Sequence, residues 1–251
     1  ERDIISFCNV NGTLFFTAND GTHGKELWKS DGTSAGTVLV KDIVAGGSTS
    51  SPGHFLDVEG TLFFTTYADT GGYYSGALWK SDGTPQGTVE VMRHFSFSEG
   101  FETAVVNETI FFVIFDWSKG VELWKTDGTP SGTMLVKDIR SGADSSRPEA
   151  LTVMNDALYF LADDGVNGKE LWKSDGTSAG TVLVKDIAAG ASSSSILNMR
   201  AVASLLYFSA NDGINGSELW KSDGTAAGTV IVKDISPGIA SSSPDSFVSV
   251  N

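Results

Sequence analysis

The residues in this sequence best suited to bind a ligand are aspartates and asparagines that stand just before a glycine. The pattern Asn/Asp-Asp-Gly occurs at residues 19–21, 163–165 and 211–213. Asp69 and Asp116 keep part of it. Carboxylate and amide oxygens are the ligands that calcium prefers, but the Asp-x-Asp-x-Asp-Gly spacing of a calcium loop is absent. A calcium ion at Asp20, Asp164 and Asp212 is therefore one hypothesis, and plain turns closed by the side chains are the favoured one. No other cofactor is expected.

Aromatic and amide residues stand in the same segments. A flat apolar ring beside hydrogen-bonding groups is what a sugar-binding surface needs. Drift of exposed turns would explain the same variation between segments, and this alternative stays open. The candidate ligand-binding residues are Asn19, Asp20, His23, Tyr67, Asp69, Tyr73, Tyr74, Asp116, Trp117, Asp164, Asn167, Asp212 and Asn215.

The sequence offers little that could perform catalysis. The three histidines share no metal-ligand spacing, and no nucleophile motif occurs. A glycosidase needs a matched pair of carboxylates. Asp57 and Glu102 stand in segments expected to form first strands, but later repeats have nothing equivalent, and Arg200 stands there instead. We therefore expect no catalytic residues, with a glycosidase-like enzyme as the less favoured alternative.

These segments belong to an internal repeat of about 48 residues. The dipeptide Leu-Trp recurs, ending at Trp28, Trp79, Trp124, Trp172 and Trp220. Four of these positions differ by multiples of 48, and only Trp79 is displaced, by three residues. Five units at this period favour a single domain. The expected repeats are 6–53, 54–101, 102–149, 150–197 and 198–245.

Each repeat predicts four short strands joined by turns. In the first repeat, Asn11-Gly12 is a strong hairpin signal. Asp31-Gly32-Thr33 marks a later turn, in which we expect the aspartate to accept a backbone N–H. The corresponding aspartates are Asp31, Asp82, Asp127, Asp175 and Asp223. The strands are expected at residues 6–10, 13–17, 26–29 and 37–43.

Apolar runs such as Leu14-Phe15-Phe16 place hydrophobic residues on both faces of the expected sheets. A strand buried on both faces needs a neighbouring sheet on each side, and sheets packed in a ring supply this. The sequence therefore predicts an all-β fold, a β-propeller of five blades with four antiparallel strands each. The repeated tryptophans are expected to fill the wedges between blades.

Residues 246–251 are a sixth copy of the first strand, matching residues 6–11. One terminal copy is expected to close the ring. The alternative is that the parent protein continues with further repeats. The first residues, Glu1 to Ile4, include no initiating methionine and show no signal-peptide pattern, so we expect a segment of a longer chain.

The net charge of −14 argues against nucleic acid and anionic membranes as partners, because both attract basic surfaces. No apolar run is long enough to suggest membrane insertion. Cys8 is the single cysteine, so no intrachain disulfide forms. Scarce lysine with abundant Gly, Ser, Thr, Asp and Asn is typical of a secreted or cell-surface bacterial protein.

The string Glu-Leu-Trp-Lys-Ser-Asp-Gly-Thr at residues 26–33 recurs unchanged at 170–177 and 218–225, and with small changes at 77–84 and 122–129. It resembles the bacterial repeat family named for its ELWxxDGT motif. The resemblance covers essentially the whole chain and implies an exported, repetitive protein that forms propellers. In architecture the chain is also similar to five-bladed lectins of the tachylectin type, which implies sugar binding between blades.

The favoured function is thus non-enzymatic recognition or adhesion. The expected ligand is a carbohydrate, bound between blades on the face with the longer loops. That face should hold both the Asn/Asp-Asp-Gly turns and the connections between blades, because antiparallel strands send alternate turns to opposite sides. A structural or protein–protein interaction scaffold is the alternative.

Overall fold

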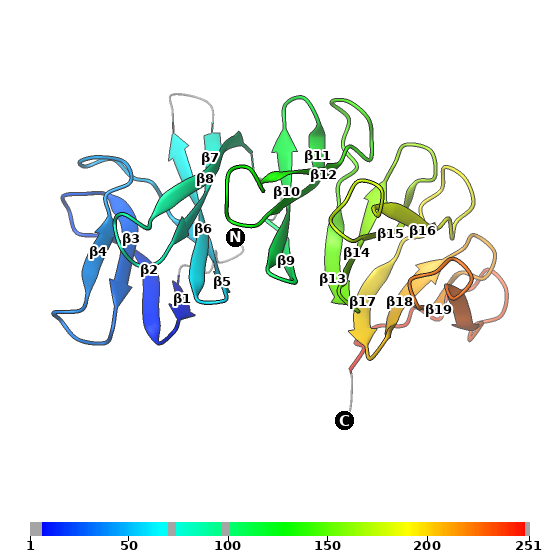
Figure 1. Ribbon diagram of the computed structural model, residues 1–251. Helices are drawn as coiled ribbons and strands as arrows, with labels where there is room; N and C mark the ends of the chain where they lie inside the picture. The colour runs from blue at the N-terminus through cyan, green and yellow to red at the C-terminus, as the bar shows by residue number, and fades with distance from the viewer. Residues whose placement is uncertain (1–6, 70–73, 97–100, 249–251) are drawn as a thin grey trace. The chain divides into compact units, whose positions relative to one another are not determined.

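The computed structural model describes residues 7–69, 74–96 and 101–248, which form five separate four-stranded sheets (Figure 1). Every sheet is an antiparallel meander whose strands are neighbours in sequence order. None of the described residues forms a helix, so the described chain contains no helix that could span a membrane. The expected all-β class is confirmed, as are five sheets of four antiparallel strands.

The first two sheets consist of β1 (Phe7–Val10), β2 (Thr13–Asn19), β3 (Lys25–Ser30), β4 (Val38–Lys41), β5 (Gly53–Val58), β6 (Thr61–Asp69), β7 (Tyr74–Ser81) and β8 (Val89–Phe95). The third sheet consists of β9 (Thr103–Val106), β10 (Thr109–Asp116), β11 (Gly120–Thr126) and β12 (Met134–Lys137). The last two consist of β13 (Glu149–Met154), β14 (Ala157–Asp163), β15 (Lys169–Ser174), β16 (Val182–Lys185), β17 (Leu197–Val202), β18 (Leu205–Asn211), β19 (Ser217–Ser222) and β20 (Val230–Lys233).

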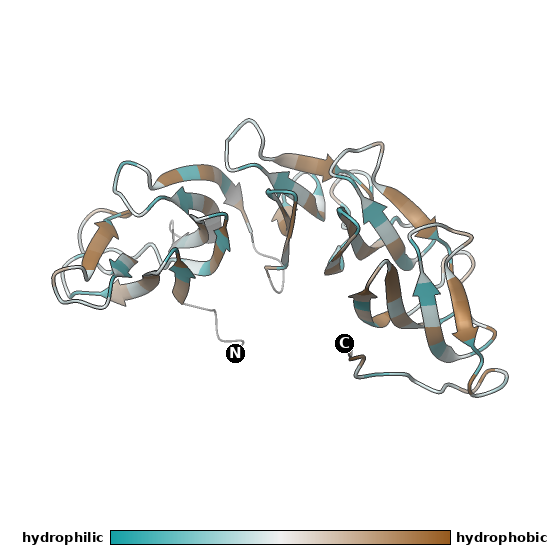
Figure 2. Cartoon of the chain, turned by 60° about the horizontal axis from the view of Figure 1, so that its bottom comes forward, coloured by the Kyte–Doolittle hydropathy of each residue, from teal (hydrophilic) through white to brown (hydrophobic). Residues whose placement is uncertain are grey.

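The second strands of the third and fourth sheets are buried on both faces, whereas Leu14 on β2 of the first sheet is 41% exposed. All five residues from Ile110 to Ile114 are at most 3% exposed, and those from Leu158 to Ala162 are at most 5% exposed. In Figure 2 most of the brown, hydrophobic colour lies on strands, which also carry teal bands, and the loops are mostly white or teal. The sheets therefore need neighbours on both sides, as the apolar runs predicted.

The chain divides into two compact units. One contains the first two sheets together with residues 126–133, and the other contains the remainder of the third sheet with the fourth and fifth. Within each unit, neighbouring sheets share a hydrophobic core. Trp172 packs with Phe111 and Leu123 of the preceding sheet, and Trp220 packs with Leu171. The expectation that the repeated tryptophans fill the space between sheets is confirmed for these residues.

Lysines link each sheet to the next one within a unit. The Nζ atoms of Lys41, Lys137 and Lys185 donate hydrogen bonds to the carbonyls of Thr88, Thr181 and Thr229, at 2.7, 2.8 and 2.7 Å. The same ammonium groups lie 5.8 to 6.0 Å from the ring centroids of Trp79, Trp172 and Trp220. Each contact combines a hydrogen bond with a cation–π attraction.

The Asp-Gly-Thr turns are closed by their own side chains. Oδ1 of Asp31 accepts from the backbone N–H and the hydroxyl of Thr33, at 2.9 and 2.7 Å, and Thr33 Oγ1 in turn accepts from the Gly36 N–H. The same bonds recur at Asp82, Asp127, Asp175 and Asp223. The predicted structural role of these aspartates is confirmed.

Several strand bounds of the first sheet differ from the prediction, since β2 extends to Asn19, β3 covers Lys25–Ser30 and β4 begins at Val38. The fourth strand of the first sheet ends at Lys41 rather than at residue 43, because the Ile43 N–H turns to the side chain of Glu26. Residues 246–248 form no strand, and the first-strand position of the first sheet is occupied by β1, which pairs with β2. Ring closure by residues 246–251 stays a prediction.

Candidate functional site

A buried glutamate supports the long connection that follows most of the sheets. Glu122 on β11 is fully buried, and its two oxygens accept the Ser146 N–H at 2.9 Å and the Ser146 hydroxyl at 2.6 Å. They also accept the N–H groups of Ile139 at 3.2 Å and Arg140 at 3.4 Å. Corresponding bonds surround Glu26, Glu170 and Glu218. The carboxylate thus shapes the connection from inside.

Burial raises the pKa of Glu122, although the hydrogen bonds from Ser146, Ile139 and Arg140 lower it in part. Its lone pairs are used by the connection itself. Glu122 is therefore a support for the site above it and not a group that meets a ligand.

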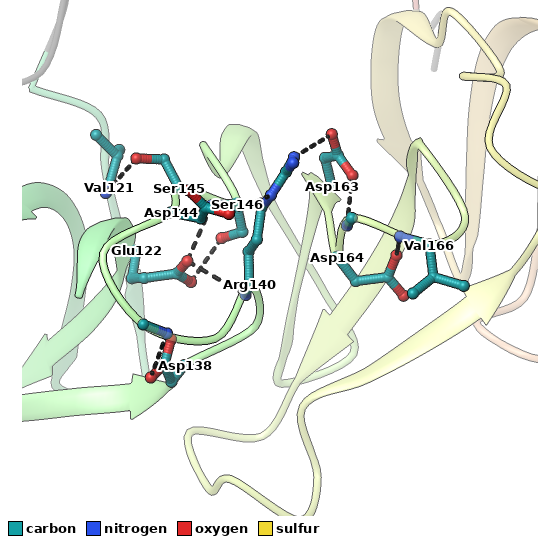
Figure 3. Close-up of polar contacts among 12 residues, drawn as sticks. Val121, Glu122, Asp138, Arg140, Asp144, Ser145, Ser146, Asp163, Asp164 and Val166 are labelled. Carbon is teal, nitrogen blue, oxygen red and sulfur yellow. Dashed lines mark hydrogen bonds and ion pairs between the residues drawn. The ribbon is translucent and has the colours of Figure 1, made fainter.

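Above this support, the connection between β12 and β13 meets the turn between β14 and β15. A pocket of about 360 Å³ lies between them. Figure 3 shows the Arg140 side chain extending from the connection to Asp163 at the end of β14. The predicted placement of turn and connection on one side of the sheets is thereby confirmed here. The pocket is lined by Arg140, Ala143, Asp144, Ser145, Ser146, Arg147, Asp163 and Lys169.

Arg140 is fixed from three sides. Its Nη1 lies 2.9 Å from Oδ2 of Asp163, and its Nε lies 3.8 Å from Oδ2 of Asp144. The other oxygen of Asp163 accepts the Gly165 N–H at 2.7 Å. A Cβ atom at Gly165 would come within 3.3 Å of Nε, so the guanidinium lies directly against this turn. The arginine thus joins the turn to the connection.

The remaining polar groups differ in how far they are engaged. Ser145 Oγ accepts the Val121 N–H at 2.9 Å, so its hydroxyl proton stays available to a ligand. Lys169 Nζ pairs with Oε1 of Glu149 at 2.9 Å. Arg147 is exposed, and among the described residues no hydrogen bond or ion pair engages its guanidinium. Its backbone N–H is fixed at 3.1 Å from the Val121 carbonyl.

The two arginines distinguish this connection from the others. Arg140 stands where the corresponding connections have Val44, Ala188 and Ser236. Arg147 stands where they have Ser51, Ser195 and Ser243. Two of the five arginines in the chain therefore fall on one connection. The buried glutamate thus recurs under four connections, whereas the pair of arginines occurs only in the connection between β12 and β13.

The turn around Asp20 forms a local cluster of its own. Oδ1 accepts the N–H groups of Thr22 and His23 at 2.8 Å each, and Oδ2 lies 2.7 Å from Nδ1 of His23. The hydrogen bonds from the backbone and ring of His23 and from the Thr22 N–H lower the pKa of Asp20 to about 2. The hydrogen bond to the Asp20 carboxylate raises the pKa of His23. Asn19 Oδ1 accepts the Gly21 N–H at 2.8 Å.

The turns at Asp164 and Asp212 repeat this geometry with an asparagine in place of the histidine. Each aspartate accepts two backbone N–H groups with Oδ1 and the side-chain amide of Asn167 or Asn215 with Oδ2. Burial alone would raise the pKa of Asp164, but these hydrogen bonds together outweigh it, so the pKa lies below its ordinary value. In the described parts of the chain, no group of three His, Cys, Asp or Glu side chains is arranged to hold a metal ion. The calcium hypothesis gains no support and stays a prediction.

The aromatic candidates are spread over separate turns. Trp117 is 71% exposed and packs edge-to-face on Phe115, with the ring centroids 5.0 Å apart. Asp116 accepts the N–H and hydroxyl of Ser118. Tyr67 is half-buried on β6, and its N–H bonds the Ser50 carbonyl. Tyr73 lies outside the described residues, as do the side chains of Asp69 and Tyr74.

The two carboxylates considered for catalysis accept hydrogen bonds from backbone N–H groups. Asp57 accepts the Gly60 N–H at 2.9 Å, and Glu102 accepts the Leu151 N–H at 3.3 Å. Arg200 is exposed on β17. Of the candidate ligand residues, Asp164 and Asn167 lie in the turn beside the pocket, one and four residues beyond Asp163. The residues that line the pocket were not predicted as ligand-binding, although the break in the repeat at Arg140 and Arg147 marks two of them.

No protein-family model matches the chain, and no curated protein sequence matches it. Solved structures do resemble it. A puromycin hydrolase is 14% identical with a TM-score of 0.52, covering 93% of this chain and 39% of its own. A prolyl endopeptidase is 14% identical with a TM-score of 0.50, covering 92% of this chain and 35% of its own.

The chain thus spans about two fifths or less of these two enzymes. An exo-β-1,3-galactanase from Phanerochaete chrysosporium is 12% identical with a TM-score of 0.37, covering 90% of this chain and 62% of its own. At such identities, the similarity to the first two shows a shared fold and nothing about activity.

Proposed function

We propose that this chain is a five-bladed β-propeller that binds carbohydrate in the pocket between Arg140 and Arg147, and that it catalyses no reaction. We further propose that it belongs to the ELWxxDGT repeat proteins and acts at a bacterial cell surface or after secretion. The propeller is supported by the five meander sheets, by strands buried on both faces and by the lysine contacts between successive sheets.

The observation that carries the carbohydrate proposal is the chemistry of the pocket. Sugar hydroxyls both donate and accept hydrogen bonds, and the pocket offers hydroxyl, carboxylate and guanidinium groups at fixed positions. Its volume of about 360 Å³ falls within the roughly 300–1,000 Å³ of small-molecule sites. The buried Glu122 and the Arg140–Asp163 pair hold these groups in place before any ligand arrives.

The same contacts argue against catalysis at this site. Asp144 and Asp163 both pair with Arg140. A glycosidase needs two carboxyl groups that meet the scissile bond, whereas these two are engaged by the guanidinium of Arg140. The pocket is therefore better suited to holding a ligand than to cleaving one.

A protein-interaction scaffold is the second candidate, favoured by exposed apolar residues on the same turns. Val166 and Ile214 occupy corresponding positions in the turns after β14 and β18 and are 69% and 70% exposed. Repeated apolar side chains on one side of the sheets are typical of protein contact surfaces.

A glycan array tests the proposal, with the folded chain applied in calcium and again in chelator. We expect binding to a defined saccharide in both conditions, lost in Arg140→Ala. The matched control is Ala188→Ser at the corresponding position of the next connection, which should bind as the wild type does. A blank array with folded protein would reject the carbohydrate proposal in favour of the scaffold. Loss of binding in chelator alone would instead assign the ligand site to the aspartate turns.

A further inference from the structure

We infer that the pocket selects an acidic sugar, whose carboxylate binds the guanidinium of Arg147. This inference rests on the proposed carbohydrate function and adds the class of ligand. It is carried by an imbalance among the charges that surround the pocket.

The cations of the pocket are neutralised unequally. Arg140 faces two carboxylates, those of Asp163 at 2.9 Å and Asp144 at 3.8 Å. Lys169 is paired with Glu149 at 2.9 Å. Arg147 has neither an ion pair nor a hydrogen bond to its guanidinium within the described residues. The charge that remains open to an anion is therefore that of Arg147.

The backbone does not explain an arginine at this position. Arg147 has a φ of +48°, and the corresponding residues Ser51, Ser195 and Ser243 have φ values of +47°, +48° and +46°. Left-handed backbone is uncommon for residues with a Cβ atom, and serine satisfies it in three of four connections. The long cationic side chain at 147 adds nothing to the turn, so we assign it to the ligand.

The geometry around Arg147 suits a sugar carboxylate. The planar guanidinium presents parallel N–H donors that match the two oxygens of a carboxylate. The backbone of Arg147 is held by the Val121 carbonyl at 3.1 Å, so the side chain starts from a fixed position. The hydroxyl of Ser145 and the outer oxygens of Asp144 lie in the same pocket and can bond the ring hydroxyls of the sugar.

The test compares two trisaccharides of the same linkage that differ only at C6 of each unit. Tri-galacturonate and galactotriose share their ring hydroxyls, but only the first has a carboxylate at C6. Calorimetric titration in chelator should show the acidic trimer binding at least tenfold more tightly to the wild type. Arg147→Ser, which restores the residue of the other three connections, should weaken the acidic trimer at least tenfold and the neutral one much less, so that the preference for the acidic trimer is lost.

Arg147→Lys provides a second variant. It keeps the charge but loses the paired donors, so its affinity for the acidic trimer should lie between those of the wild type and Arg147→Ser. Ser195→Ala is the control and should bind both trimers as the wild type does. Circular dichroism of each variant should be unchanged.

The outcomes separate the two proposals. Equal affinity for the acidic and neutral trimers would overturn the inference while the carbohydrate function stands. Tighter binding of a sulfated galactose trimer than of the galacturonate would also overturn it, because the site would then select a sulfate ester. A blank on the glycan array overturns the function itself, and the inference with it.

Discussion

The connection over residues 138–149 and the next one, over residues 186–197, have the same support and different surfaces. In the second, Glu170 accepts the N–H groups of Ile187, Ala188 and Ser194 at 3.0, 3.2 and 3.0 Å, as Glu122 does in the first. The backbone φ at Arg147 and Ser195 is +48° in both. What differs is two side chains: Arg140 replaces the buried Ala188, and Arg147 replaces the exposed Ser195. The protein thus separates the residues that shape a connection from those that it presents to a ligand.

The largest effect is expected from removing the shared support. Glu122→Ala would leave the N–H groups of Ile139, Arg140 and Ser146 without their acceptor. Each unpartnered buried donor costs about 1–3 kcal/mol, so we expect a loss on the order of 3 kcal/mol in the free energy of unfolding. Glu122→Gln keeps one acceptor oxygen and should lose less.

Denaturant unfolding measures this loss, and hydrogen exchange of the Ser146 amide locates it. The Glu170→Ala variant should be destabilised to a similar extent while leaving sugar binding at the first connection unchanged. An unchanged exchange rate at Ser146 in Glu122→Ala would show that the connection does not depend on the glutamate.

The next largest effect is expected from giving the second connection the charged residues of the first. Ala188→Arg, Ser195→Arg and Asn211→Asp together would give the second connection the counterparts of Arg140, Arg147 and Asp163. Because the support is already present, we expect a second binding site for the acidic trimer, raising the calorimetric stoichiometry from one to two. The same variant with Ser195 retained is the matched control and should keep one site. A single site in the full transplant would mean that the difference between the connections lies deeper than their surfaces.

The smallest effect is a dependence of stability on pH. Burial, partly offset by hydrogen bonds, raises the pKa of Glu170 above its ordinary value of 4.5. The folded protein therefore holds this proton more tightly than the unfolded chain does. The stability that this contributes is fully present below pH 4.5 and is lost as the pH rises through the folded-state pKa.

The difference in unfolding free energy between wild type and Glu170→Gln, measured from pH 4 to pH 8, isolates this contribution. It should fall with rising pH across that range. A difference that does not change with pH would show that Glu170 ionises as it does in the unfolded chain.

Much of the fold could be predicted because its determinants are local. The apolar runs such as Leu158-Tyr159-Phe160 and the aspartates such as Asp175 act within a few residues of their own position. The role of Glu122 could not be predicted in this way, because its partners Ile139 and Ser146 lie 17 and 24 residues further along the chain.

The site was harder to predict than the fold for a related reason. Arg140 and Arg147 are visible in the sequence as departures from the repeat. The residues around Arg140, however, do not indicate that its side chain reaches Asp163, which lies 23 residues further along the chain at the end of β14. In the sequence, the oxygens of Asp164 and Asp212 resemble metal ligands, yet they accept hydrogen bonds within their own turns.

The lysine contacts between sheets give the array a direction. Lys137 and Lys185 each contact the following sheet, through the carbonyls of Thr181 and Thr229 and the rings of Trp172 and Trp220. The stability of each sheet then depends on its contacts with the neighbouring sheet, as in repeat proteins, where each repeat contacts only its neighbours. A fault in one Asp-Gly-Thr turn weakens the sheet before it as well as its own. Within the unit that contains the fourth and fifth sheets, melting should therefore spread from the later sheet to the earlier one.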